Sequence, residues 1–225
     1  MIIESDTKVG KLAARHPLAT RVFARHGIDF CCGGGRPLGE VCREKGVDTD
    51  TVLQEIRKEL RTTDDGEARW DEAPLGELID HIVVTYHLPL AEELPRLQEM
   101  AEKVAQVHGE KDPERLPELL TVFTALKNEL EEHMAEEEKV LFPMIRNGAG
   151  ADATDPVSTL EHEHEAAGEA LRRLRSLTDD YETPAGACNT WRALWHGLAA
   201  LESSLHQHIH LENNILFPRA LAESR

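Results

Sequence analysis

The sequence carries little positive charge for its size and has no long apolar run. Its 225 residues include 25 Lys and Arg against 42 Asp and Glu, which gives a formal net charge of −17. Binding to nucleic acid or to an anionic membrane surface needs a basic patch, so we expect neither partner. No apolar run approaches the ~18 residues of a membrane span, and the first residues lack the pattern of an export signal. We therefore expect a cytoplasmic protein.

Cysteine and aromatic residues are also scarce. The four cysteines are too few for a disulfide scaffold, and a bridge between the adjacent Cys31 and Cys32 would close no useful loop. Phe, Trp and Tyr make up 4% of the chain, whereas His alone occurs 12 times. A helical interior poor in aromatic side chains and rich in His and Glu suggests that it holds something other than side chains.

Gly and Pro divide the sequence into helical segments of two lengths. Short helices are predicted at Thr7–His16, Leu18–His26, Leu38–Lys45 and Thr49–Arg61, and long amphipathic ones at Pro74–His108, Pro113–Arg146, Asp155–Leu177 and Pro184–Leu221. A turn-rich loop from Gly27 to Pro37 separates the second and third short helices, and residues 62–66 form a linker. Short links between long helices favour an antiparallel bundle. The sequence thus predicts an all-α fold, with a small helical domain at 1–65 and an up-down-up-down four-helix bundle at 66–225.

The inward positions of bundle helices recur at alternating steps of three and four residues. On each long segment this stripe is apolar except for one histidine near a common height, and on two segments it also includes a glutamate one turn later. His108 also lies on the stripe of the first segment, but it is ~30 Å along the helix from His87 and is left out of the set. The stripe of the second segment runs from Leu119 to Met144 and includes Val140. The polar members of the four stripes are His87, His133, Glu137, His164, His208 and Glu212. Off the stripes, and expected in solvent, are Glu136, Glu138, His162, Glu163, His206 and His210.

These six inward polar residues need a common explanation, although a single inward histidine is usually an ordinary core residue. Burying them without counter-charge would cost several kcal/mol per ion, which metal cations would largely remove. The motif His-x3-Glu-x4-Phe-Pro also occurs twice, from His133 to Pro143 and from His208 to Pro218. In an up-down-up-down bundle the four histidines lie at one height, within a turn of ~5.4 Å. We therefore expect the six side chains to converge.

The composition of this ligand set indicates which metals it suits. Four imidazoles and two carboxylates are too many for one tetrahedral zinc and too rich in nitrogen for calcium or magnesium. They fit two first-row metal ions, each bound by two histidines, with both glutamates spanning the pair; iron is favoured over manganese or zinc. Coordination positions left open would accept water, oxide, dioxygen or nitric oxide, which points to chemistry or transport rather than to a structural role.

These bundle motifs resemble those of hemerythrin-like domains. Together with Ile28-Asp-Phe-Cys31-Cys32-Gly-Gly, they make the whole chain resemble the iron–sulfur cluster repair di-iron proteins, the RIC group. The resemblance implies a non-haem, oxo-bridged pair of iron ions on the six residues named above, and polar residues near the metal path at Glu129 and Glu163. It also implies cytoplasmic repair of clusters damaged by nitric oxide or oxidants, by donating iron to damaged or apo iron–sulfur proteins. The sequence departs from the family at Tyr86-His87-Leu-Pro89, where a proline replaces a polar stretch.

Cys31 and Cys32 leave two interpretations open. They either fill a turn as a buried pair, or form a reactive site that flanking glycines expose and loop N–H groups stabilise as thiolate. A reactive pair would reduce the di-iron site, or capture iron or nitric oxide. Cys42 and Cys188 are expected to be packing residues.

Three functions remain open on the sequence alone. The first is iron-donating repair, which needs no enzymatic turnover. The second is a nitric oxide or peroxide reductase with Cys31 and Cys32 as the electron entry. The third is a sensor or store of dioxygen, nitric oxide or iron. A homodimer, in which the thiols of one subunit reach the iron of the other, also stays open.

Overall fold

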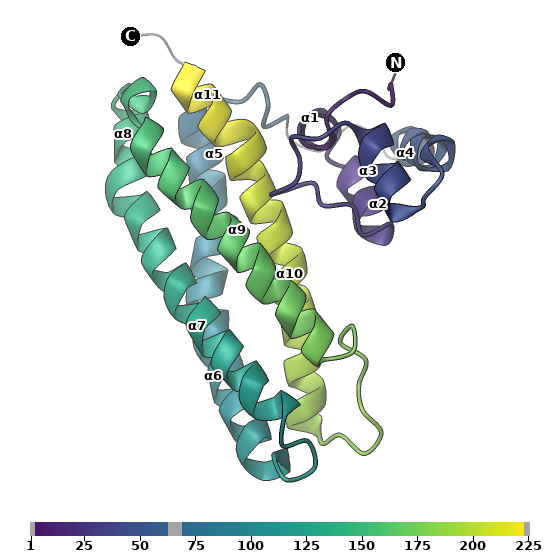
Figure 1. Cartoon of the computed structure of the whole chain (residues 1–225). Helices are drawn as coiled ribbons and strands as arrows, with labels where there is room; N and C mark the ends of the chain where they lie inside the picture. The colour runs from purple at the N-terminus through teal and green to yellow at the C-terminus, as the bar shows by residue number, and fades with distance from the viewer. Residues whose placement is uncertain (1–2, 63–68, 223–225) are drawn as a thin grey trace.

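The computed structural model describes residues 3–62 and 69–222, and within them the chain is all-helical. Figure 1 shows a long four-helix bundle with a small helical domain against its side. The all-α fold is as the sequence predicts, whereas the sequence left open where the small domain lies on the bundle. The predicted domain boundary after residue 65 lies outside the described residues. No helix in the described ranges is both long and apolar enough to cross a membrane.

The small domain consists of four short helices around its own core. They are α1 (Val9–Arg15), α2 (Ala19–Arg25), α3 (Leu38–Lys45) and α4 (Thr49–Thr62). The side chain of Asp48 caps α4 by accepting a hydrogen bond from the Thr51 N–H at 2.9 Å. Gly46 ends α3 in the left-handed region with φ of 66°, which glycine adopts without strain. Phe23 and Ile56 are fully buried between these helices.

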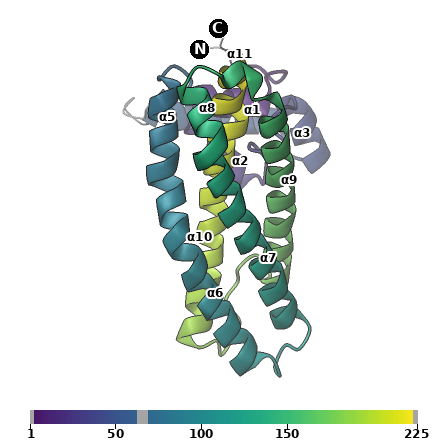
Figure 2. The same ribbon diagram turned by 90° about the vertical axis from the view of Figure 1, so that its left-hand side faces the viewer.

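The bundle has four columns of helix, seen side by side in Figure 2. The columns are α5 (Leu75–Ile82), η1 (Val83–His87) and α6 (Leu88–His108); α7 (Arg115–Glu136), η2 (Glu137–Leu141) and α8 (Phe142–Arg146); α9 (Thr154–Leu177), preceded by a short 3₁₀ turn, η3 (Gly150–Asp152); and α10 (Asn189–Leu211), η4 (Glu212–Leu216) and α11 (Phe217–Ala222). The fourth column begins later than the predicted Pro184. The chain before it turns through three left-handed residues, Asp179, Asp180 and Tyr181.

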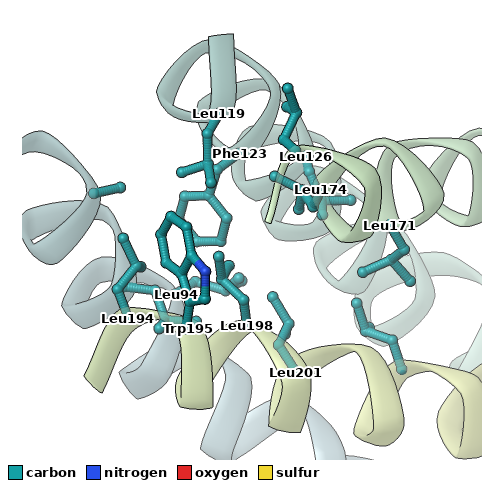
Figure 3. Close-up of a cluster of buried hydrophobic side chains, with 14 of the residues drawn as sticks. Leu94, Leu119, Phe123, Leu126, Leu171, Leu174, Leu194, Trp195, Leu198 and Leu201 are labelled. Carbon is teal, nitrogen blue, oxygen red and sulfur yellow. The ribbon is translucent and has the colours of Figure 1, made fainter. Parts of the chain in front are cut away.

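Two apolar clusters fill the bundle and leave one level between them for polar groups. The cluster toward α6 and the start of α10 includes Phe123, Trp191 and Trp195 and is shown in Figure 3. The cluster at the other end includes Leu141 and Phe217. Along three columns the apolar residues of the two clusters stop on either side of the predicted histidine; in the second column the first cluster extends past His133 to Met134, and the other cluster resumes at Leu141. The polar level is thus closed at both ends by packed hydrocarbon.

Three columns contain a π-helical turn at this polar level, and each turn is followed by a dipeptide with proline second: Leu88-Pro89, Phe142-Pro143 and Phe217-Pro218. Proline lacks an N–H and its ring clashes with the carbonyl four residues earlier, so a wider turn accommodates it inside a continuous helix. The extra residue in η2 shifts the inward stripe by one position. Val140 is therefore 48% exposed and Leu141 is 1% exposed, and the prediction that Val140 faces the core was wrong.

Candidate metal centre

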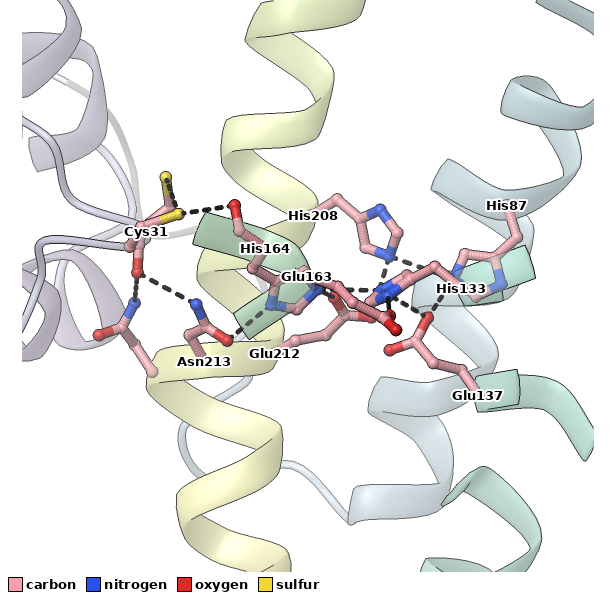
Figure 4. A network of polar contacts seen from close by, with 11 residues as sticks. Cys31, His87, His133, Glu137, Glu163, His164, His208, Glu212 and Asn213 are labelled. Atoms are coloured by element: carbon pink, nitrogen blue, oxygen red, sulfur yellow. Dashed lines mark hydrogen bonds and ion pairs between the residues drawn. The ribbon is translucent and has the colours of Figure 1, made fainter. Parts of the chain in front are cut away.

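The six polar residues of the stripes meet at the level between the two apolar clusters (Figure 4). His87 ends η1, His133 and His164 come from α7 and α9, and His208 comes from α10. Glu137 and Glu212 are the first residues of the π turns η2 and η4. All six are at most 4% exposed. The six positions selected by their spacing are therefore buried and lie close to one another.

The possible ligand atoms of these residues form two groups. One group contains His87 and His208, the other His133 and His164, and both contain Glu137 and Glu212. Within each group the ligand atoms lie within 4.8 Å of one another. This arrangement, in which two pairs of imidazoles share two carboxylates, could hold two metal ions side by side.

In the first group, the inward ring nitrogens of two histidines lie close to each other and to the two glutamate carboxylates. The Nε2 atoms of His87 and His208 are 3.1 Å apart. His87 Nε2 lies 3.3 Å from Glu137 Oε2, and His208 Nε2 lies 2.9 Å from Glu212 Oε1. Nitrogen lone pairs at this separation repel unless a proton or a cation lies between them.

The second group repeats this geometry on the other side of the glutamates. The Nε2 atoms of His133 and His164 are 3.0 Å apart. His133 Nε2 is 3.5 Å from Glu137 Oε2, and His164 Nε2 is 3.3 Å from Glu212 Oε2. The two halves of the cluster are therefore chemically equivalent in their donors.

Three of the four histidines donate a hydrogen bond from Nδ1 to an oxygen outside the cluster. The acceptors are Glu138 for His87 (2.8 Å), Glu163 for His133 (2.7 Å) and Asn213 for His164 (2.8 Å). A proton on Nδ1 leaves Nε2 with its lone pair directed inward, which is the usual arrangement for a metal-binding histidine. The fourth ring, His208, stacks instead on Tyr86 with 5.2 Å between the ring centroids.

Several buried atoms of the cluster have no hydrogen-bond partner. They are both carboxylate oxygens of Glu137, Oε2 of Glu212 and Nδ1 of His208. A buried carboxylate without donors is costly unless a cation compensates its charge. The orphaned oxygens, the inward lone pairs and the donor types together fit two bound metal ions.

Without metal, the cluster binds protons in place of cations. Burial acts to lower the pKa of His87 and His164, but their close contacts with the carboxylates of Glu137 and Glu212 outweigh it and raise the values to about 8 and about 9. Burial and the charge of Glu212 raise the pKa of Glu137. Burial also acts to raise the pKa of Glu212, yet His208 and His164 hold it well below its usual value. Metal binding must therefore displace protons from this site.

Two of the outer hydrogen-bond acceptors were not expected from the sequence. Glu138, expected in solvent, and Asn213 each directly follow one of the shared glutamates, so the repeated motif contained a signal for them. The resemblance predicted that Glu163 lies near the metal path, whereas its position off the stripe predicted that it lies in solvent. In the structure it is half-buried against His133. Glu129 is exposed on α7 and belongs to neither group.

The small domain covers a face of α10 that the bundle stripes alone leave open. His210 is buried, and its ring meets the ring of Phe30 at 5.6 Å between centroids, so the expectation of a solvated His210 was wrong. His206 is half-buried beside the same phenylalanine. Cys188 was expected to pack inside, but it is exposed, with its Sγ 3.3 Å from Nε2 of the buried His108. Cys42 is buried and His162 is exposed, as expected.

The loop of the small domain that holds the paired cysteines lies directly against α9. Cys31 is buried and Cys32 is half-buried, so the glycines do not leave the pair freely accessible. The Sγ of Cys32 lies 3.4 Å from the backbone oxygen of His164. The N–H groups of both cysteines donate to Asp29 Oδ1 at 3.0 Å, and not to a thiolate as expected. A hydrogen bond between the two Sγ atoms, together with burial, raises the pKa of Cys31, and the same bond lowers that of Cys32.

Two asparagines that follow Glu212 bind this loop to the bundle. Asn214 Nδ2 donates to the backbone oxygens of Phe30 and Cys31 at 3.1 and 3.3 Å. Asn213 accepts from His164 through Oδ1 and donates to the Cys31 oxygen through Nδ2 at 3.5 Å. A Cβ at Gly34 would lie 2.7 Å from Asn214 Oδ1, so a glycine is required for this approach. In Figure 4 Asn213 lies between Cys31 and His164.

Comparison with known proteins agrees with both parts of the chain. The family model described as the hemerythrin HHE cation binding domain matches residues 78–220, and a domain of unknown function, DUF542, matches residues 5–60. The iron-sulfur cluster repair protein YtfE of Pectobacterium carotovorum (strain PC1) is 44% identical over 96% of this chain and 97% of its own length.

Two further relatives of the same name show a similar likeness. The protein of Edwardsiella ictaluri (strain 93-146) is 44% identical over 97% of this chain and 98% of its own. The protein of Escherichia coli O81 (strain ED1a) is 43% identical over 96% and 97%. The chain therefore belongs to the hemerythrin HHE cation-binding family and, over nearly its whole length, to the YtfE group of iron–sulfur cluster repair proteins.

Proposed function

We propose that His87, His133, Glu137, His164, His208 and Glu212 bind two non-haem iron ions with an oxo bridge, and that the protein donates this iron to damaged or apo iron–sulfur proteins. One observation carries the metal centre: Glu137 and Glu212 each belong to both groups of buried ligand atoms. The names of the relatives support the repair role. The cytoplasm as its location, and nitric oxide or dioxygen as small ligands, belong to the same proposal.

The residues of the cluster suit the uptake and release of a cation cargo. The four Nε2 atoms bind iron as neutral donors, and the hydrogen bonds from Nδ1 to Glu138, Glu163 and Asn213 keep three rings aimed inward. When iron leaves, protons return to His87 and His164, whose pKa values of about 8 and about 9 make the protonated empty site stable at neutral pH. Imidazole and carboxylate also hold iron less firmly than a cage of thiolates.

The test measures iron and its delivery together. The full-length protein is expected to contain two iron ions per chain and to restore a cluster-depleted iron–sulfur enzyme without added iron. Glu212→Leu removes a ligand of both groups and should abolish both properties, whereas His162→Ala alters an exposed residue of the same bundle and should retain them. Purified wild-type protein without stoichiometric transition metal would contradict the proposal.

A reductase is the second candidate, and the position of Cys32 favours it. Its Sγ lies 3.4 Å from the backbone of His164, close enough for the thiol pair to serve as the electron entry. Oxidation of both thiols to a disulfide would supply two electrons and two protons, which balances the reduction of two nitric oxide molecules to nitrous oxide and water. Sustained nitrous oxide production with an added reductant, lost in Cys31→Ser/Cys32→Ser, would favour this function over iron donation. A passive sensor or store gains no support, because it needs no thiol pair at this position.

A further inference from the structure

A second group of possible ligands lies beside the cluster of His and Glu. The carboxylate of Asp29 and the Sγ atoms of Cys31 and Cys32 all lie within 4.8 Å of one another. Among the described residues, this is the only such group that contains none of the six cluster residues. Its donors differ in kind from those of the cluster, because two of the three are sulfur.

The spacing of these donors is the spacing that a metal ion imposes. Two thiolates bound at ~2.3 Å to one tetrahedral metal lie about 3.8 Å apart. The Sγ atoms of Cys31 and Cys32 are 3.7 Å apart, and Cys31 Sγ is 3.3 Å from Asp29 Oδ1. A disulfide would instead require the sulfurs to approach to ~2.05 Å. Binding a cation would therefore require less movement of the two Sγ atoms than forming a disulfide between them.

The loop holds its carboxylate in place before any ligand binds. Asp29 Oδ1 accepts the N–H groups of Cys31 and Cys32, each at 3.0 Å, and this fixes the side chain beside the sulfurs. A Cβ at Gly33 would lie 3.2 Å from Asp29 Oδ2, so glycine leaves room for the second oxygen. Asn214 holds the backbone of the loop on the bundle.

One residue of the cluster, His164, also contacts the cysteine loop. His164 directs Nε2 into the cluster, and its backbone oxygen lies 3.4 Å from Cys32 Sγ. This carbonyl offers the loop site an additional oxygen donor. Asn213 bridges the His164 ring and the Cys31 backbone. A cation that leaves the cluster past His164 would therefore meet the thiols first.

We propose that Asp29, Cys31 and Cys32 form a second metal site for a thiophilic divalent cation, and that iron leaving the His and Glu cluster passes through it. The second half of this statement rests on the proposed iron-donating function. Binding releases the thiol protons to solvent and involves no change of oxidation state. Thiolate donors bind such cations more firmly than the cluster does, which directs transfer from the cluster toward the loop and on to the cysteines of a recipient.

Titration of the metal-free, full-length protein with Co²⁺ tests the site itself. The wild type is expected to bind one equivalent with a sulfur-to-metal charge-transfer absorption, in addition to the two equivalents of the cluster. Cys31→Ser/Cys32→Ser should lose that absorption and that equivalent while it retains the other two. Cys188→Ser, which alters an exposed thiol at the start of α10, should retain all three.

The variant Asp29→Asn separates the ligand role from the shape of the loop. Asparagine keeps an oxygen to accept the two N–H groups, but it removes the negative charge beside the sulfurs. We expect the sulfur-bound Co²⁺ to bind about 10–100-fold more weakly, the range found when a supporting metal-site residue is replaced. Unchanged affinity would exclude Asp29 as a ligand. Absence of a sulfur-to-metal absorption in the wild type would overturn the whole site.

The rate of iron transfer to a soluble ferrous chelator tests the passage of iron. Iron-loaded Cys31→Ser/Cys32→Ser should release its iron at least ~10-fold more slowly than wild type with equal iron content, and its helicity should be unchanged. An equal rate would overturn the passage and leave the loop site standing. A wild type that takes up no iron in the cluster, yet shows the Co²⁺–sulfur absorption, would instead overturn the proposed function alone.

Discussion

The bundle and the loop of the paired cysteines position their chemistry in different ways. In the bundle, each of the six polar residues occupies a periodic inward position on a long helix, between two apolar clusters. In the loop, Cys31 and Cys32 are placed by contacts with another part of the chain, above all with Asn214 and the His164 backbone. Periodicity therefore determines the first site, and docking between domains determines the second.

The largest effect should come from the shared glutamates of the bundle. Glu137→Leu or Glu212→Leu should each lose both metal ions, because each carboxylate serves both groups. Each substitution also leaves buried imidazole groups without their counter-charge, and breaking a buried charged pair in this way destabilises a metal-free protein by about 3–5 kcal/mol. Iron per chain, together with chemical denaturation of the metal-free variants, measures both effects. Retention of one firmly bound ion in either variant would show that the glutamate is not shared.

A histidine substitution should have about half this effect on metal content. His87→Ala removes a ligand from one group and His133→Ala removes one from the other, so each variant should retain a single metal ion. Spectra that depend on coupling between two ions should disappear in both. Complete loss of metal from either variant would mean that the ions bind only as a pair, which makes the two halves less independent than their geometry indicates.

The π turn in η2 predicts opposite outcomes for two neighbouring residues. Leu141→Ala should reduce the free energy of unfolding by about 2–5 kcal/mol, because it leaves a cavity in a packed cluster. Val140→Thr should change it by less than ~0.5 kcal/mol, because that position faces solvent. Denaturant unfolding of the two variants gives the comparison. A larger loss of stability in Val140→Thr than in Leu141→Ala would show that Val140 faces the core after all, and would contradict the π turn.

The smallest effect should come from two adjacent glycines of the loop. Gly34→Ala places a methyl group against Asn214 and should cost about 1–3 kcal/mol of stability. Gly35→Ala is its matched control, because a Cβ at Gly35 meets nothing within 4 Å. Neither variant should lose metal from the bundle. Equal stability of the two would show that the loop docks without the close approach at Gly34.

The fold and the six polar residues could be predicted from the sequence because a bundle obeys one spacing rule. The rule holds as far as Glu137 and Glu212, and in the second column it fails directly afterwards, where the turn before Pro143 contains an extra residue and exposes Val140. Glycine and proline also located every short helix of the small domain.

What the sequence did not predict depends on contacts between distant parts of the chain. His210 was expected in solvent because the helical stripe carries no information about Phe30, which covers it. The loop N–H groups were assigned to a thiolate because nothing in the glycine pattern indicates that Asp29 accepts them. Such contacts appear only when the small domain is placed on the bundle.

The stretch from Glu212 to Asn214 serves three neighbours within less than one turn of helix. Glu212 enters the cluster, Asn213 holds the His164 ring, and Asn214 holds the backbone of the cysteine loop. The last column therefore contacts both the other helices and the loop of the first domain through consecutive residues. A hybrid that joins the N-terminal part of one relative to the bundle of another would have to keep these three residues with the loop they hold, or it would gain a folded bundle and lose its connection to the thiols.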